Sequence, residues 1–235
     1  MARINAQYNV ARPDSLPVRI AAKMRRVMYD EFLARCAPSQ ADTILDVGVT
    51  SENKYEASNY LEAWYPHKDR ITACGIDDCA FLEAKYPGLR FVRADGCALP
   101  FADGAFDFVH SSAVLEHVGN REMQLRLLIE LRRVARRGVF FTTPNRWFPV
   151  EFHSVLPLLH WLPSSAFRAC LRALGHAELA DEAHLNLLTP AQVRSLCIDA
   201  MRDGRVTVDC VRLWGWPSNI IAHWHADDAL NLPRG

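Results

Sequence analysis

The sequence predicts an α/β fold in which a doubly wound, mostly parallel seven-stranded sheet carries helices on both faces, with a helical insertion after the fifth strand. Short apolar runs rich in β-branched residues alternate with stretches of helical periodicity from residue 43 to residue 143. This alternation is typical of parallel strands, because each parallel connection needs a crossover, usually a helix. Two further runs near the C-terminus predict a closing hairpin at the edge of the sheet.

The strands are justified by local composition. The first run is largely apolar and ends in Asp46-Val47-Gly48, as expected of a buried parallel strand. A Pro87-Gly88 turn precedes the third. The parallel strands are expected at residues 43–48, 71–76, 89–93, 106–110 and 138–143, and the closing pair at 206–213 and 218–225.

The helices are justified by apolar residues at helical spacing. Residues 16–36 show this pattern with basic residues between, which predicts an N-terminal helix. Thr189 and Pro190 are typical of a helix start and predict a helix to Ala200. The aromatic- and proline-rich residues 147–175 predict a helical insertion packed over the sheet. Other helices are expected at 58–65, 79–85 and 121–135.

Composition limits the function classes. Lys and Arg together number 27, as do Asp and Glu, so no overall charge favours nucleic acid or an anionic membrane. The seven cysteines lack the close spacing of metal or redox motifs and indicate a reducing compartment. With no signal-like or membrane-spanning apolar run, we expect a cytoplasmic protein without stable membrane insertion, a nucleic-acid partner or a metal. The clustered Arg132, Arg133, Arg136 and Arg137 are interpreted as a solvated helix face.

The residues that end the first four strands are the candidate ligand site, because open α/β sheets bind ligands beyond the carboxyl ends of their strands. Gly48 permits a close approach of the backbone to a ligand. Asp77 is placed to accept hydrogen bonds from ribose hydroxyls, and Asp95 from an exocyclic amine. Each alone is commonly a turn residue, but one such piece per strand favours a ligand site. The predicted set is Asp46, Gly48, Asp77, Asp95, Gly96, Ser111 and Ser112.

These residues lie in runs that resemble the seven-stranded class I methyltransferases, most closely the type-11 or ubiquinone-biosynthesis-like branch. The resemblance covers residues 45–144, and its most specific parts are 94–101 and Leu-Glu-His-Val at 115–118. It implies S-adenosylmethionine as the cofactor, with Asp77 on the ribose, Asp95 on the adenine and Gly48 beside the methionine part. It also implies a single methyltransferase domain over 1–235, divided into a helical extension 1–40, a cofactor-binding core 41–146, an acceptor-side insertion 147–188 and closing elements 189–235.

The cofactor loop departs from the family pattern Asp-x-Gly-x-Gly-x-Gly. This chain has Val49-Thr50-Ser51-Glu52 after Gly48, and a β-branched Thr50 resists a positive φ. Ser58, Asn59 or Tyr60 could supply polar contacts instead, or Tyr60 could pack as core and Asn59 cap the following helix. A dinucleotide dehydrogenase or a hydrolase is disfavoured, because neither Gly-x-Gly-x-x-Gly nor Gly-x-Ser-x-Gly is present.

Methyl transfer is an in-line displacement for which the protein aligns the reactants and excludes water. His110, His117 and His153 are the candidate bases; we expect a structural role for His117 and prefer His153, although a loop histidine held by a cap is an equal alternative. Asn145 and Trp147, with His153, are the predicted acceptor site. The function predicted is methyl transfer to a small-molecule, lipid-like or glycan-like acceptor. The alternative is a non-catalytic protein that binds the cofactor on the same fold.

Overall fold

The structure is a computed structural model that describes residues 15–52, 56–151 and 156–227. Its sheet has seven strands in the order β3-β2-β1-β4-β5-β7-β6. β7 is antiparallel to both of its neighbours, and the other pairs are parallel, so the predicted fold class is confirmed. The strands are β1 Ile44–Val47, β2 Ile71–Gly75, β3 Arg90–Arg93, β4 Phe106–Ser112, β5 Ala135–Pro144, β6 Arg205–Leu213 and β7 Trp216–His225.

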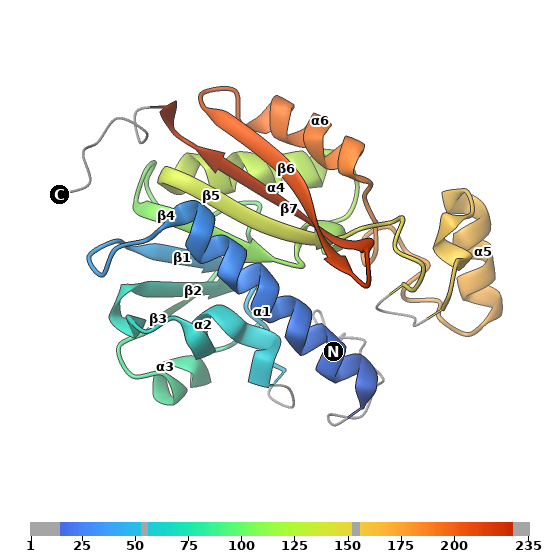
Figure 1. The fold of residues 1–235 in the computed structure, drawn as a ribbon, viewed down its shortest axis with the longest axis horizontal. Coiled ribbons are helices and arrows are strands. Elements are labelled where there is room, and N and C mark those ends of the chain that lie inside the picture. Colours follow the sequence, from blue (N-terminus) through green and yellow to red (C-terminus); the bar gives the residue numbers. More distant parts are fainter. Residues whose placement is uncertain (1–14, 53–55, 152–155, 228–235) are drawn as a thin grey trace.

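Two helical layers cover the sheet (Figure 1). One face packs against α4 and α6, and the other against α1, α2 and α3, each around its own apolar core. α5 stands beyond the ends of the strands, with a third, smaller core. The helices are α1 Leu16–Cys36, α2 Tyr60–Trp64, α3 Phe81–Lys85, α4 Arg121–Val134, α5 Ser164–Ala173 and α6 Pro190–Ala200, and the 3-10 turns are η1 Glu56–Asn59, η2 Lys68–Arg70, η3 Leu115–His117 and η4 Leu159–Trp161.

Several boundaries differ from the sequence-based expectation, and three of them bear on the site or the sheet. β4 continues to Ser112, so Ser111 and Ser112 belong to the strand rather than following it. β5 begins at Ala135, which pairs with Phe106 of β4. The predicted helix over 58–65 is a 3-10 turn followed by the short α2. Pairing between strands about thirty residues apart decides the first two, and local periodicity does not report it.

The helix start at Thr189 is confirmed. The Thr189 hydroxyl accepts a hydrogen bond from the Gln192 backbone N–H, and the Gln192 side chain accepts one from the Thr189 backbone. This capping box satisfies backbone donors that would otherwise lack a partner at the start of α6.

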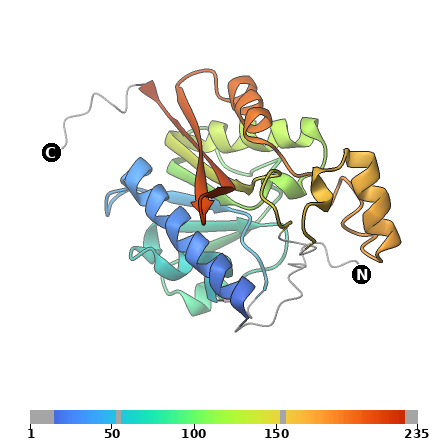
Figure 2. The same cartoon turned by 45° about the vertical axis from the view of Figure 1, so that its right-hand side comes forward.

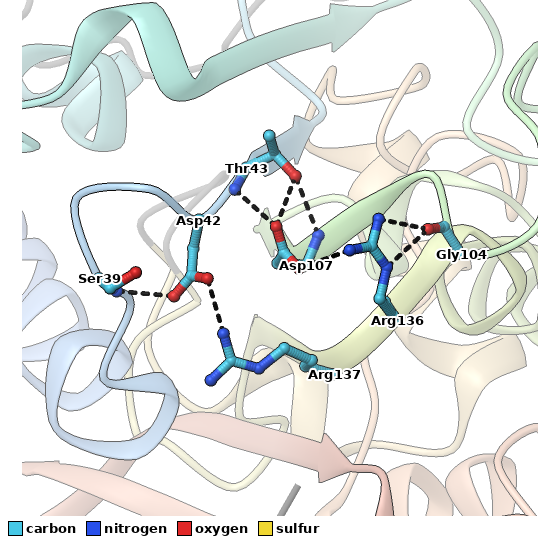
Figure 3. A network of polar contacts seen from close by, with 7 residues as sticks. All are labelled: Ser39, Asp42, Thr43, Gly104, Asp107, Arg136 and Arg137. Atoms are coloured by element: carbon cyan, nitrogen blue, oxygen red, sulfur yellow. Dashed lines mark hydrogen bonds and ion pairs between the residues drawn. The ribbon is translucent and has the colours of Figure 1, made fainter. Parts of the chain in front are cut away.

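The arginine cluster is not a solvated helix face, and that interpretation is corrected. Arg136 and Arg137 lie in β5, where they bind Asp107 at 3.1 Å and Asp42 at 2.7 Å (Figure 3). Arg133 binds Glu130 and Asp103. Arg132 binds Asp203 and lies 3.7 Å from the centroid of the Trp224 ring. Each arginine therefore fastens one part of the fold to another.

The pairs of Figure 3 lie where β1, β4 and β5 begin. The Asp107 carboxylate accepts hydrogen bonds from the Thr43 backbone N–H and the Thr43 hydroxyl, both at 2.9 Å. Asp42 accepts from the Ser39 backbone N–H at 2.7 Å. This amino edge is thereby closed by polar contacts, which leaves the opposite, carboxyl edge as the place for a ligand. None of the described helices is long and apolar enough to cross a membrane.

Candidate functional site

Gly48 makes the sharp turn that follows β1. Its φ is +104°, a conformation that favours glycine, and an added Cβ would overlap the side chain of Val114. The Gly48 backbone N–H donates to the Cys74 carbonyl oxygen at 2.7 Å, which ties the turn to the end of β2. The backbone here runs close to its neighbours, as a loop that approaches a ligand requires.

The rest of the loop is held by Asn59 instead of by further glycines. The Asn59 Oδ1 accepts from the Thr50 backbone N–H, and the Asn59 Nδ2 donates to the Thr50 carbonyl oxygen, both at 2.9 Å. Among the described loop residues only Gly48 has a positive φ, so Thr50 is not strained. Asn59 thus clamps the loop, and its side chain makes no capping hydrogen bond to α2.

Asp46 lies inside β1 and is buried toward α1 and α2. Its Oδ1 is 2.6 Å from His110 Nδ1, and His110 Nε2 is 2.9 Å from the Tyr60 hydroxyl. Tyr60 is 2% exposed and packs as core, which is the second of the alternatives predicted for it. His110 also stacks on Phe140. The three polar side chains form one buried row below the cofactor loop.

Burial sets the protonation of this row. It raises the pKa of Asp46 to about 7 and lowers the pKa of His110 to about 4. The fully buried Glu62 carboxyl adjoins Asp46, and burial together with the Asp46 charge raises its pKa well above the ordinary value. Burial therefore favours the neutral forms of these groups: His110 is uncharged at physiological pH, and the Glu62 carboxyl holds its proton more tightly than a solvated one.

Asp77 and Asp95 lie at matching positions beyond β2 and β3. Gly75 pairs with Arg93 in the sheet, so each aspartate follows its strand by two residues. Asp77 is half-buried and Asp95 is exposed, with one Asp95 oxygen accepting from the Cys97 backbone N–H at 2.8 Å. Ile76 is 43% exposed. Two carboxylates beside an exposed apolar side chain suit a flat, polar-edged ligand.

Gly96 and the β4 serines take structural positions around this site. A Cβ on Gly96 would lie 2.8 Å from Leu127 Cδ1, so glycine lets α4 approach the end of β3 closely. The Ser111 hydroxyl, 2% exposed, donates to the Val47 carbonyl oxygen at 2.9 Å. The Ser112 hydroxyl is 3.0 Å from the Thr142 hydroxyl and is half-buried at the carboxyl edge. Of the two serines, Ser112 has the greater access to a ligand.

The predicted acceptor residues follow β5. Asn145 is 4% exposed: its Oδ1 accepts from the Trp147 backbone N–H at 3.1 Å, and its Nδ2 donates to the Pro217 carbonyl oxygen at 2.9 Å. Trp147 is half exposed. His153 and Phe152 lie outside the described residues. His117 is held through Nδ1 by the His184 carbonyl oxygen at 2.7 Å, in keeping with the structural role expected for it.

Comparison with known sequences shows what part of the chain is similar to. A model described as a methyltransferase domain matches residues 57–143. An uncharacterized methyltransferase of Mycobacterium marinum is 36% identical over 147 residues, which make up 58% of this chain and 52% of the relative. One from Mycolicibacterium gilvum is 32% identical over 133 residues, 56% of this chain and 50% of the relative. Residues 57–143 of the chain are therefore similar to a methyltransferase domain.

Solved methyltransferase structures share the fold of this chain. A methyltransferase from Aquifex aeolicus superposes with a TM-score of 0.53 at 15% identity, covering 90% of this chain and 98% of that one. The magnesium protoporphyrin IX methyltransferase of Synechocystis, solved with S-adenosylhomocysteine, gives 0.54 at 12% identity, covering 90% and 86%. The chain spans about half the length of the curated relatives it matches.

The match to the family model begins at residue 57, so residues 49–52 of the loop and α1 are understood from geometry alone. Two residues near the loop, one in α2 and one in α1, were not predicted from the sequence. Glu62 lies between the buried Leu61 and the aromatic Trp64, and Arg25 lies on α1 beside the buried Met28 and Tyr29. A charged residue within an apolar stripe is the signal that could have found both.

Arg25 is a half-buried cation near the site. Burial lowers the pKa of Arg25 and raises the pKa of Tyr60, and the Arg25 charge offsets part of the rise at Tyr60, so the two side chains lie near one another. Neither a hydrogen bond nor an ion pair joins Arg25 to another residue in the described part of the chain. A guanidinium that has lost water without gaining a carboxylate is suited to bind an anionic group of a ligand.

Proposed function

We propose that the chain transfers the methyl group of S-adenosylmethionine to a hydroxyl, amine or carbon of an acceptor. The observation that carries this proposal is the pair Asp77 and Asp95 beside exposed Ile76, at the same carboxyl edge as the Gly48 turn. The bound cofactor would supply an electrophilic methyl group on a sulfonium. Aligning the acceptor and excluding water are then the tasks of the protein.

The residues present fit the cofactor part by part. Asp77 would accept hydrogen bonds from the ribose hydroxyls, and Asp95 would accept one from the adenine amine. Ile76 would lie against the apolar face of the adenine ring. The Gly48 turn gives the backbone access to the methionine part, and Arg25 would bind the methionine carboxylate. In a glycine-rich loop the backbone N–H groups would be free to bind the ligand, whereas here the Thr50 backbone is hydrogen-bonded to Asn59. The Arg25 cation from α1 would compensate for these lost donors.

The acceptor would bind beyond β5. Asn145 orients it indirectly, because its side chain fixes the backbone of Trp147. Trp147 lies among exposed apolar side chains at this end, which supports an acceptor with an apolar part, whether lipid-like or glycan-linked. His153 remains our proposed base. The seven cysteines form no disulfide, which supports a cytoplasmic location.

Calorimetry with S-adenosylmethionine tests the proposal. Replacing Asp77 by Ala should weaken binding about tenfold or more, because a charged hydrogen-bond acceptor to the ligand is lost. Asp69→Ala is the matched control, since Asp69 precedes the same strand at its opposite end and pairs with the exposed Arg70. Equal affinity of both variants would refute the site.

Turnover is tested separately with methyl-labelled S-adenosylmethionine and a metabolite extract. Transfer of label that is lost in Asp77→Ala supports an enzyme. Tight cofactor binding without any transfer favours the alternative, a cofactor-binding protein of the same fold.

A further inference from the structure

A small hollow is lined by residues of the chain that leaves β5 and of the start of α5. Figure 2 shows α5 standing beyond the ends of the strands. The polar lining of the hollow consists of Arg146, His160, Ser164, Arg168 and Asn186. Phe167, Leu185 and Leu187 complete the wall. Arg146 directly follows Asn145, so the hollow borders the proposed acceptor site.

The hollow has more positive than negative charge. Arg146 Nη2 donates to the Leu162 carbonyl oxygen at 2.9 Å, and no carboxylate pairs with Arg146 in the described part of the chain. Burial and the charge of Arg168 lower the pKa of Arg146, and both arginines line the hollow. Glu182 lies 3.4 Å from Arg168 and is the one acid that pairs with either arginine in the described residues. An anion between the arginines would relieve their repulsion.

His160 supplies a second, independent indication. It is 1% exposed, and its Nε2 is 2.7 Å from the Phe148 carbonyl oxygen, which places the proton on Nε2. Burial lowers the pKa of His160 despite the nearby Glu151, so the ring is neutral and Nδ1 is an acceptor. That buried Nδ1 has no hydrogen-bond partner in the described part of the chain. A buried acceptor without a donor is costly, and a ligand hydroxyl would satisfy it.

The start of α5 adds to the attraction for an anion. Ser164 is the first residue of this ten-residue helix and lines the hollow, with its hydroxyl 3.5 Å from Arg146 Nη1. The residue before it is Pro163, whose side chain cannot cap the first backbone N–H groups. These groups and the helix dipole favour a negatively charged oxygen.

We propose that this hollow binds a phosphate monoester group of the methyl acceptor. A singly protonated phosphate carries anionic oxygens for the two arginines and the helix start, and also a hydroxyl for His160 Nδ1. A carboxylate or a phosphate diester has the anionic oxygens but no such hydroxyl. The identification of the ligand as the acceptor rests on the proposed methyl transfer; the phosphate site itself does not.

Amide NMR titration of the full chain tests this at constant ionic strength, with inorganic phosphate, dimethyl phosphate and acetate as probes. We expect saturable shifts around residues 160–168 with phosphate, and about tenfold weaker binding of the two other anions. Arg146→Gln should weaken phosphate binding about tenfold. Arg172 is an exposed arginine of α5, and Arg172→Gln is the matched control, which should leave phosphate binding unchanged.

The proposal is overturned if phosphate gives no saturable shifts, if acetate binds as well, or if the two arginine variants behave alike. The affinity of each variant for S-adenosylmethionine is measured in parallel, and Arg146→Gln should retain the wild-type value. Phosphate binding by a wild-type protein that does not bind S-adenosylmethionine would refute the proposed function and the assignment to an acceptor, while the phosphate site would stand.

Discussion

At the scale of single residues, the row formed by Asp46, His110 and Tyr60, with the adjoining Glu62, shows how burial controls charge. Burial raises the pKa values of the carboxyls and lowers the pKa of the imidazole. The pKa of Asp46 rises from 3.8 to about 7, so the folded state keeps a proton that the unfolded chain has lost, and stability falls as pH rises across this range. The pKa of His110 falls from 6.5 to about 4, so stability rises with pH over that interval. The opposing effects of Asp46 and His110 on stability largely offset one another. The raised pKa of Glu62 then leaves a net fall in stability as pH rises.

Glu62→Gln should therefore stabilise the protein more at pH 7 than at pH 5. The wild-type carboxyl must stay protonated in the fold while the unfolded chain ionises above the ordinary pKa of 4.5, and glutamine does not titrate. The difference in unfolding free energy between variant and wild type should grow by about 1–3 kcal/mol over this interval. Urea denaturation at both pH values measures it. Glu178→Gln on the surface is the control, and a pH-independent effect of Glu62→Gln would contradict the account.

Arg25→Gln should weaken binding of S-adenosylmethionine about tenfold, because the methionine carboxylate loses its cation. Binding of adenosine, which lacks that carboxylate, should not change. Arg26→Gln is the neighbouring control, since Arg26 is exposed and pairs with Asp30. Calorimetry with both ligands decides: equal losses for adenosine and S-adenosylmethionine would mean that Arg25 acts only on the fold.

At the scale of elements, the two ends of the strands differ in how their polar groups are used. The amino edge holds completed networks, as at Asp107 and Asp42, whereas the carboxyl edge holds Arg25 and Arg146 without acidic partners in the described part of the chain. Alternating strands and helices were enough to predict the sheet and most of its elements. The beginning of β5 was missed, because its pairing with Phe106 lies far away in sequence.

The proposed site could be inferred from the sequence only in part, for a related reason. Asp77, Asp95 and Gly48 lie within two residues of the ends of their strands, so the strand pattern is enough to propose them. The Asn59 clamp and the neighbourhood of Arg25 depend on how a turn and a helix fold back on the sheet. No local pattern in the sequence encodes either contact.

Asp107→Ala should destabilise the protein by about 1–3 kcal/mol, because it removes the acceptor of two Thr43 hydrogen bonds and the partner of Arg136. The affinity for S-adenosylmethionine should be unchanged at the opposite edge. Thermal or urea unfolding, together with calorimetry, measures both. Asp103→Ala, whose side chain is 83% exposed, should cost less than about 0.5 kcal/mol; a comparable cost for the two variants would count against the amino-edge network.

At the scale of the whole molecule, the net charge is balanced, but paired arginines and exposed apolar side chains are unevenly distributed. The arginines of α4 and β5 form ion pairs that connect parts of the fold. Several exposed apolar side chains lie in the segments that follow the carboxyl end of β5 and in the neighbouring turn between β6 and β7. They are Trp147, Leu158, Trp161, Leu162, Trp214 and Trp216. This end of the molecule therefore combines the proposed cofactor, acceptor and phosphate positions.

Amide hydrogen exchange of the full chain with and without S-adenosylmethionine tests the central claim most directly. We predict that the cofactor slows exchange around residues 48–52, 76–78 and 95–97, and leaves the amino edge around 42–43 and 104–107 unaffected. Protection confined to the amino edge, or none at saturating cofactor, would contradict the assignment of the carboxyl edge as the site.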